Sequence, residues 1–348
     1  MKFLRYKQYM IGLLALSLFA SCDFEKINTN EFEMLPEEGK MDGISVGGPI
    51  TALQKCVVPV GTQDDGTNVA NEYQVAYHLA ADCWSGYFAQ NNNWNSGRNN
   101  LTYFLMDGWV SASYTSAYTK VIPLWQDIKI KTEKDFPEAY ALAQILKVST
   151  WHKATDMFGP IPYKEAGKGL ISVPYDSQAD VYKYMFEDLT NAIGVLTNAL
   201  EHGTTKLLPN ADAVYGGNVK KWIVYANSLM LRLAMRVYYA DEAMSKKYVL
   251  QAVNNPYGVM QSKGDEAKME KGAGLTFINN IEILSNQYNE CRMGSSMQAY
   301  LGGYEDPRLP KYFTESEAYF AKKVGQYGSY MAVPTGNIAV SYTHLRAH

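Results

Sequence analysis

The stretch from Trp84 to Tyr103 is the part of the sequence best suited to hold a ligand by stacking and hydrogen bonding. It combines aromatic rings with amides and an arginine, and its candidate ligand-binding residues are Trp84, Tyr87, Asn92, Asn93, Trp94, Asn95 and Arg98. Sugars present apolar C–H faces that stack on rings, and hydroxyl groups that need both donors and acceptors. Amide side chains offer both, and a guanidinium offers a forked donor. This combination predicts a carbohydrate-binding loop.

Trp94 lies in a run of asparagines where no apolar stripe would bury its ring, which favours an exposed stacking platform. The alternative is a loop in which the asparagines form turns and Trp94 folds onto the body of the protein. A second candidate segment comprises residues 287–289 and Arg292, in which Tyr288 would supply the ring. For this segment, too, a loop packed on helices is the alternative.

Common catalytic and metal-binding motifs are missing from the sequence. It contains no Gly-x-Ser-x-Gly, His-Glu-x-x-His, phosphate-binding loop or dinucleotide fingerprint. Cys56, Cys83 and Cys291 lack the spacing of a zinc knuckle, and they could form one disulfide or stay as thiols. A scattered pair of glycosidase carboxylates, or loop oxygens around a structural Ca²⁺, would leave no pattern. We therefore expect a binding protein rather than an enzyme, with no cofactor, and leave calcium open.

Composition narrows the class of partner. The chain has 348 residues, 47% of them hydrophobic, and 27 tyrosines, enough for a large core with rings left over for the surface. Its formal net charge is −3, and it has no long run of Lys or Arg. Nucleic acid is therefore excluded as the expected partner.

The N-terminus has the features of an export signal. Lys2, Arg5 and Lys7 precede an apolar run that is too short to span a membrane. Leu18-Phe19-Ala20-Ser21-Cys22 resembles a lipobox, which implies that residues 1–21 are removed and that Cys22 is acylated and anchors the chain in a membrane. The acidic residues that follow resemble the surface-export signal of Bacteroidetes lipoproteins.

Three further segments are expected along the chain. Residues 22–66 are rich in Gly, Pro and acids, which predicts an irregular leader or tether, and residues 67–340 form the helical domain. Residues 341–348 resemble translated sequencing adaptor, so we interpret them as a non-native tail and the natural chain as continuing beyond this one.

Helical periodicity dominates residues 67–340 and indicates a mainly α fold. The clearest helix is 178–200, with apolar residues at steps of three or four and Ser177 with Asp180 as a capping box. Further helices are expected from Pro137 to Phe158, stopped by Gly159-Pro160, and from Val219 to Ala240. Weaker helices are expected at 67–89 and 112–131, the latter interrupted near Pro123. The first three of these helices begin about 41 residues apart, which suggests stacked helical hairpins of the tetratricopeptide kind.

Three segments together resemble the SusD/RagB family of outer-membrane nutrient-binding lipoproteins. The first runs from Trp151 to Tyr163 and contains Asp156-Met157-Phe158-Gly159-Pro160-Ile161-Pro162. The second, Lys221 to Arg236, contains Ala226-Asn227-Ser228-Leu229-Met230-Leu231-Arg232-Leu233-Ala234. The third is Asp306-Pro307-Arg308-Leu309, preceded by Ser295-Ser296-Met297 and followed by Tyr312-Phe313.

The resemblance implies a tetratricopeptide-like helical scaffold with an irregular, loop-rich ligand-binding portion. It also implies a cell-surface lipoprotein that captures a glycan or oligosaccharide and passes it to a SusC-type TonB-dependent transporter. Two alternatives stay open, a peptide-binding member of the family and a helical-repeat scaffold for protein interactions. Within the motifs we expect structural roles: Trp151 between helices, Asp156 bonded to the turn at Gly159, and Arg232 and Arg236 paired with acids.

Overall fold

The computed structural model describes residues 44–58, 74–269, 281, 283–288, 290–315 and 330–334. The chain forms two compact units, Met1–Ser45 and Val46–His348, and nearly all described residues belong to the second. The predicted signal at 1–21, the acylation of Cys22 and the tail at 341–348 lie outside the described residues. Among the helices that the structure describes, none has the length and apolar character needed to cross a membrane.

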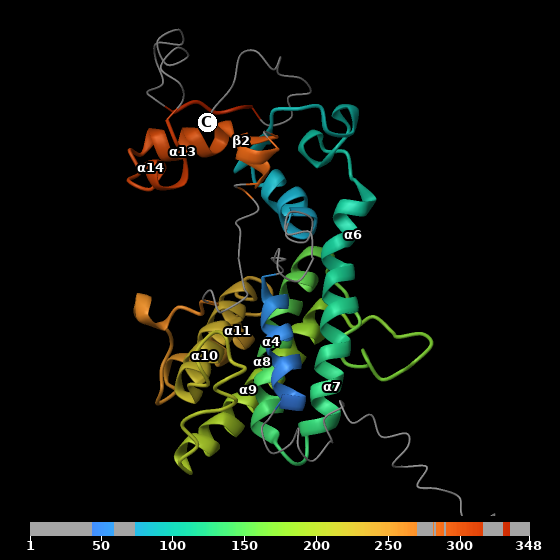
Figure 1. Ribbon diagram of the computed structural model, residues 1–348, viewed down its shortest axis with the longest axis vertical. Coiled ribbons are helices and arrows are strands. Elements are labelled where there is room, and N and C mark those ends of the chain that lie inside the picture. Colours follow the sequence, from blue (N-terminus) through green and yellow to red (C-terminus); the bar gives the residue numbers. More distant parts are fainter. Residues whose placement is uncertain are drawn as a thin grey trace, which may run out of the picture. The chain divides into compact units, whose positions relative to one another are not determined.

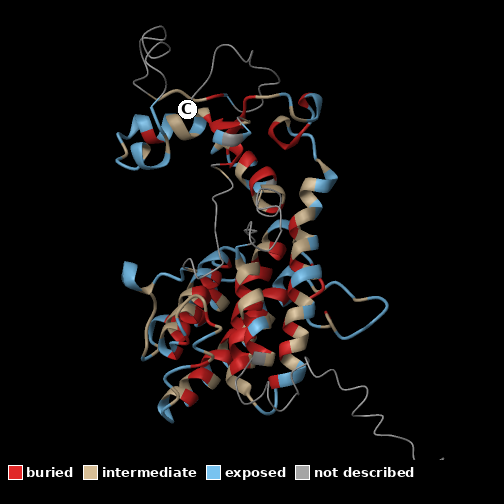
Figure 2. Cartoon of the chain, viewed as in Figure 1, coloured by how far each residue is buried: buried red, intermediate tan, exposed pale blue. Residues whose placement is uncertain are grey.

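Five helices that pack in chain order build the scaffold of the second unit (Figure 1). They are α7 (Ile122–Thr132), α8 (Pro137–Phe158), α9 (Gln178–Glu201), α10 (Val219–Arg236) and α11 (Glu242–Val253). Each contacts the next, α7 with α8, α8 with α9, α9 with α10 and α10 with α11. Their facing sides are buried, as Figure 2 shows. The mainly α prediction is confirmed.

Local sequence signals set the ends of these helices. Pro137 begins α8, and Gly159, with φ of +74°, ends it. Ser177 caps α9, because its hydroxyl oxygen accepts a hydrogen bond from the Asp180 backbone N–H at 3.1 Å. Helix α10 ends at Arg236, four residues before the predicted end, and the chain turns through the remainder.

Helix α4 (Ile44–Val57) differs from the expected irregular leader. Gly47, Gly48 and Pro49 suggested a loop, yet Val46, Ile50 and Leu53 are buried in the main core at helical spacing. Gly47 is needed for this packing, because a Cβ there would approach the Cβ of Ala211 to 2.8 Å. Tertiary burial thus overrides the weak helix propensity of this segment.

The weaker helices are shorter or broken in the structure. The segment predicted at 112–131 begins earlier, as α6 (Asp107–Ser116), and passes through a π-helical segment η4 (Ala117–Val121) into α7. The wider turn directly precedes Ile122-Pro123, because a proline cannot donate a backbone hydrogen bond to the preceding turn. The helix predicted at 67–89 is reduced to a π-helix, η1 (Gln74–Asp82), within the part described.

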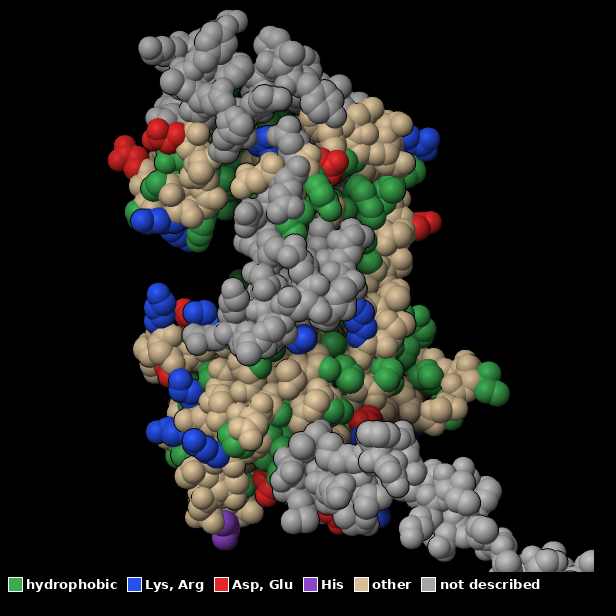
Figure 3. Space-filling view, viewed as in Figure 1, with side chains coloured by type: hydrophobic (Ala, Val, Ile, Leu, Met, Phe, Trp, Pro, Cys, Tyr) green, Lys and Arg blue, Asp and Glu red, His purple; other side chains and the backbone are tan. Residues whose placement is uncertain are grey.

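A loop with a fixed base joins α8 to α9. Ile161 and Asp176 pair as an isolated antiparallel bridge, and the Asp176 carboxylate accepts the backbone N–H of Tyr163 at 2.9 Å. The tip leaves Leu170 half-exposed and Ile171 fully exposed, and Figure 3 shows hydrophobic side chains on this protruding loop. The Trp151–Tyr163 motif therefore spans the end of α8 and the start of this loop.

Contacts within the motifs confirm the expectations for Trp151 and Arg236 and correct the one for Asp156, while the pairing of Arg232 with an acid stays a prediction. Trp151 is fully buried, and Arg236 pairs with an acid, since its Nε lies 2.9 Å from Oδ2 of Asp156. Asp156 was expected to bond the turn at Gly159, which is wrong: it accepts from the Tyr182 hydroxyl at 2.5 Å, while Gly159 N donates to the Thr155 carbonyl. The carboxylate points to a neighbouring helix rather than along its own chain.

His152 of α8 is expected to make stability depend on pH. Its side chain is only 4% exposed, and burial lowers its pKa to about 4 from an ordinary 6.5. Between pH 6.5 and 4 the unfolded chain binds more protons than the folded one, so stability falls as pH is lowered. Going from pH 7 to 5 should reduce the free energy of unfolding by about 2 kcal/mol through this residue.

Urea denaturation of the wild type and His152→Gln at both pH values measures this effect. The variant should lose the His152 contribution, whereas His202→Gln, at the exposed end of α9, should keep the wild-type dependence. Equal dependence in all three proteins would contradict the assignment to His152.

Candidate ligand-binding site

Two short strands bring distant parts of the chain together. Strand β1 (Phe88–Gln90) pairs antiparallel with β2 (Cys291–Met293), with Phe88 opposite Met293 and Gln90 opposite Cys291. Helices α13 (Ser295–Gly303) and α14 (Leu309–Tyr312) follow β2. The strand pair therefore places the Trp84–Tyr103 segment next to the segment that carries the third family motif.

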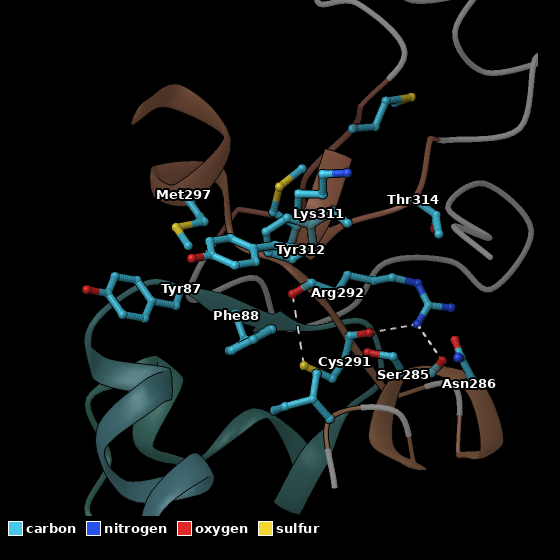
Figure 4. Close-up of a pocket in the computed structure, with 14 residues that line it drawn as sticks. Tyr87, Phe88, Ser285, Asn286, Cys291, Arg292, Met297, Lys311, Tyr312 and Thr314 are labelled. Atoms are coloured by element: carbon cyan, nitrogen blue, oxygen red, sulfur yellow. Dashed lines mark hydrogen bonds between the residues drawn. The ribbon is translucent and has the colours of Figure 1, made fainter. Parts of the chain in front are cut away.

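Two adjoining cavities open beside this strand pair. The first, of about 500 Å³, is lined by Tyr87, Arg292, Met297, Lys311 and Tyr312 among others (Figure 4). The second, of about 510 Å³, shares Tyr87, Met297 and Tyr312 with it and adds Tyr300 and Arg308. We call the two together the tyrosine groove, after Tyr87, Tyr300 and Tyr312.

The three tyrosines of the groove keep much of their ring surface open to solvent. Tyr87 is 50% exposed, Tyr312 is 56% exposed and Tyr300 is 67% exposed. The Tyr300 ring also stacks on Tyr304, with centroids 6.1 Å apart. Partly exposed rings at a cavity provide flat apolar surfaces with a hydroxyl at the edge, which suits ligands that have an apolar face and a polar rim.

Close backbone packing fixes Tyr87 beside α13. Gly294 N donates to the Tyr87 carbonyl at 2.9 Å. A Cβ on Gly294 would lie 2.2 Å from the Gly86 oxygen, so only glycine permits this approach. Gly86 itself has φ of +72°. Two glycines thus allow the chain before β1 and the chain after β2 to meet at the groove.

An ion pair fixes the start of α14 and so the position of Tyr312. The Arg308 Nε lies 2.9 Å from Oδ1 of Asp306, and its Nη2 lies 2.5 Å from Oδ2. The guanidinium lowers the pKa of the Asp306 carboxyl to about 2. Because the carboxylate holds Arg308, the charges at this end of the groove largely cancel.

The sequence-predicted site residues are only partly brought together. Tyr87 lines both cavities, whereas Trp84 and Tyr288 are exposed but line neither. Asn93, Asn95 and Arg98 are exposed and Asn92 is half-buried, again outside both cavities. The Arg98 guanidinium lies over the Phe104 ring, 4.6 Å from its centroid, and Asn95 Nδ2 donates to the Arg98 carbonyl at 2.6 Å.

Trp94 is half-buried and is not the exposed platform that was expected. Its ring packs edge-on against Trp109 with centroids 6.1 Å apart, and its Nε1 donates to Oε2 of Glu290 at 3.2 Å. Contacts with residues distant in the sequence cover part of the ring, and a run of asparagines could not reveal them. Its contact with a ligand stays a prediction.

Several amides of the same stretch serve the loop itself. Asn99 is fully buried, accepts from Leu101 N and donates to Gln90 Oε1 at 2.9 Å. Asn100 donates to the Leu79 carbonyl and accepts from Met106 N. These bonds match the alternative in which asparagines build turns.

Cys56, Cys83 and Cys291 are free thiols, which was one of the two open alternatives. Cys83 and Cys291 are buried, and burial raises the pKa of Cys291 to about 12. Cys291 Sγ lies 3.6 Å from Nε2 of His78. Within the described residues no three side chains of His, Cys, Asp or Glu are grouped as a metal site would require.

A model of the SusD-like family, described as "Susd and RagB outer membrane lipoprotein", matches residues 26–344. The chain belongs to the SusD/RagB family. The family is described as one of outer-membrane lipoproteins, which agrees with the expected outer-membrane localisation. The expectation of a non-enzyme agrees with a family of non-catalytic binding proteins. A search of curated proteins found no match.

Solved SusD-like structures share the fold. A chitin-binding SusD homolog from Flavobacterium johnsoniae is 32% identical with a TM-score of 0.76, covering 84% of this chain and 58% of that one. A SusD homolog from Bacteroides vulgatus is 27% identical with a TM-score of 0.76, covering 86% and 58% respectively. The chain thus spans 58% of the length of these relatives. The tetratricopeptide-like scaffold that the resemblance implied is confirmed.

The SusD-like motifs did point to groove residues that ligand reasoning missed. Met297, Arg308 and Tyr312 all belong to the third motif. Tyr300 and Lys311 lie between these positions. Tyr300 lies close to the two glycines of α13 and belongs to no apolar stripe. This position is the sequence signal that could have indicated an exposed ring.

Proposed function

We propose that this protein is a cell-surface nutrient-binding lipoprotein that captures a glycan in the tyrosine groove and delivers it to a SusC-type TonB-dependent transporter. The observation that carries the proposal is the set of three part-exposed tyrosines lining two adjoining cavities. Acylation of Cys22 anchors the protein in the membrane in this proposal. The chitin-binding description of one SusD-like relative supports a carbohydrate as the ligand class.

Capture works by stacking and hydrogen bonding rather than by turnover. A sugar ring covers an exposed tyrosine face, which removes apolar surface from water, and its hydroxyl groups bond to Ser85, Ser296 and the tyrosine hydroxyls at the groove wall. The ion pair of Asp306 and Arg308 holds α14 in place, so Tyr312 is positioned before the ligand arrives.

Tyr312→Ala is expected to weaken glycan binding about tenfold, on the order of 1.4 kcal/mol, because a ring that stacks on a ligand carries a large share of the binding energy. Tyr87→Ala should have a similar effect. Affinity electrophoresis of the purified protein in gels cast with a panel of polysaccharides identifies the glycan, and calorimetry with its oligosaccharides gives the affinity.

Tyr239→Ala is the matched control, since Tyr239 is almost fully exposed in the turn after α10. It should bind like the wild type. Unchanged mobility of a folded protein in every gel, with retention in a gel cast with a protein such as casein, would reject glycan capture and support the peptide-binding alternative. Recovery of a large barrel protein without any small ligand would instead support a protein-interaction scaffold.

A further inference from the structure

Charge is unevenly distributed along the tyrosine groove. Among the described residues that line the first cavity, the charged ones are Arg292 and Lys311, both cationic. The acids nearest to them along the described chain, Glu290 and Glu315, do not line it. At the second cavity the cation is Arg308, which Asp306 holds in an ion pair. The groove therefore has one end lined by cations and one end where charges cancel.

Arg292 is built into the wall of the first cavity. Its side chain is 7% exposed, and its Nη1 donates to the carbonyls of Ser285 at 3.0 Å and Cys291 at 2.7 Å. These bonds hold the guanidinium in one orientation. In the view of Figure 4 the guanidinium lies on the side of Asn286 and Thr314, opposite Tyr87 and Met297. The cavity thus has an aromatic side and a polar, cationic side.

Lys311 supplies a second cation at the same cavity. The residue is exposed on α14 and directly precedes Tyr312 in the chain. Its backbone N–H donates to the Arg308 carbonyl at 2.9 Å. Its ammonium makes no hydrogen bond or ion pair with the described residues. An ammonium next to a part-exposed ring can meet an acidic group on the sugar that stacks on that ring, or on its neighbour.

We propose that the tyrosine groove prefers acidic glycans, whose carboxylate or sulfate groups lie at the Lys311 and Arg292 end while sugar rings stack on Tyr312 and Tyr87. This inference rests on the proposed function and specifies its ligand class. The chain as a whole carries a net charge of −3, which repels polyanions. The preference must therefore come from these local cations and not from the general field of the protein.

The test compares oligosaccharides that share N-acetylglucosamine but differ in charge. Hyaluronan oligosaccharides carry a carboxylate on every second sugar, and chito-oligosaccharides of equal length are neutral. Calorimetry at low salt should give about threefold to tenfold tighter binding of the hyaluronan oligosaccharide, since a pair at an exposed rim is modest and screened. Chondroitin oligosaccharides with and without sulfate show which acidic group is recognised, and a preference for either supports the proposal.

Lys311→Gln should remove most of the preference for acidic glycans, and Lys311→Glu should reverse it. Lys246→Gln, which removes an equal charge from the exposed face of α11, should leave the preference intact. Raising the salt concentration should narrow the difference in the wild type. Tyr312→Ala should weaken acidic and neutral ligands alike.

Three results overturn the inference, and each does so in a distinguishable way. Binding of the neutral ligand as tight as, or tighter than, binding of the acidic ones rejects the preference and leaves glycan capture standing. A preference that survives in Lys311→Glu rejects the assignment to this end of the groove. Failure of the folded protein to bind any glycan, neutral or acidic, rejects both the inference and the proposed function.

Discussion

Replacing Asp188 by alanine should lower the free energy of unfolding by about 3–5 kcal/mol, because it leaves a buried ammonium without its counter-ion. Lys147 of α8 is 4% exposed, and its Nζ lies 2.8 Å from Oδ2 of Asp188 on α9. The same carboxylate accepts the Tyr163 hydroxyl at 2.7 Å and Gln144 Nε2 at 2.9 Å. Burial lowers the pKa of Lys147, and the carboxylate acts against that shift.

Aromatic rings surround the Lys147 ammonium and cannot replace the acid. The Nζ lies 4.4 Å from the ring centroids of both Trp125 and Tyr163. Such contacts contribute on the order of 0.5–2 kcal/mol, less than the cost of burying an unpaired charge. The ion pair and the rings together join α7, α8 and α9 at the centre of the scaffold.

Urea denaturation of Asp188→Ala, Lys147→Met and the double variant Lys147→Met/Asp188→Asn measures the coupling. The double variant should be more stable than Asp188→Ala, since it removes the buried charge together with its partner. Raising the pH should partly restore Asp188→Ala, because deprotonation of Lys147 removes the unpaired charge. A loss below about 1 kcal/mol in Asp188→Ala would show that the pair contributes little.

Asp212→Ala should lower the free energy of unfolding by a similar amount, about 3–5 kcal/mol, because this one buried carboxylate accepts hydrogen bonds from three parts of the chain. Asp212 is 4% exposed. It accepts Gln54 Nε2 of α4 at 2.7 Å, Trp222 Nε1 of α10 at 2.7 Å, and backbone N–H groups including Gly217 at 2.8 Å. Without the carboxylate these donors stay buried and unsatisfied.

Hydrogen exchange adds a local measurement to this prediction. Amides of α4 should lose protection in Asp212→Ala beyond the global loss, since the hydrogen bonds of Gln54 link α4 to the loop before α10. Asp212→Asn keeps the shape of the side chain but has fewer acceptor sites, so its stability should lie between those of the wild type and Asp212→Ala. Asp241→Ala is the control: it removes an exposed N-cap that accepts Met244 N at 2.8 Å, and should cost only about 1 kcal/mol.

The helical scaffold was largely predictable because its signals are local. Pro137, Gly159 and Ser177 mark helix ends through backbone geometry and capping, and the apolar stripe of α9 faces the core at a spacing read directly from the sequence. Helix α4 was missed because glycines and a proline hide its short stripe, and its stability comes from packing against residues more than 150 positions away, such as Ala211. Helix propensity describes a segment in isolation, whereas the burial of its side chains depends on the other segments that pack against it.

The sequence by itself determined the family, the helix order and a ligand-suited stretch that includes Tyr87. Only the tertiary structure decided the groove, because a three-residue ladder between β1 and β2, some 200 residues apart in the chain, brings Tyr87 to Met297, Lys311 and Tyr312. Strands so short carry almost no periodic pattern, so their pairing cannot be read from side chains. The same long-range packing turned Trp94 toward Trp109 and Glu290, and thereby separated the residues that hold the loop from those that face the groove.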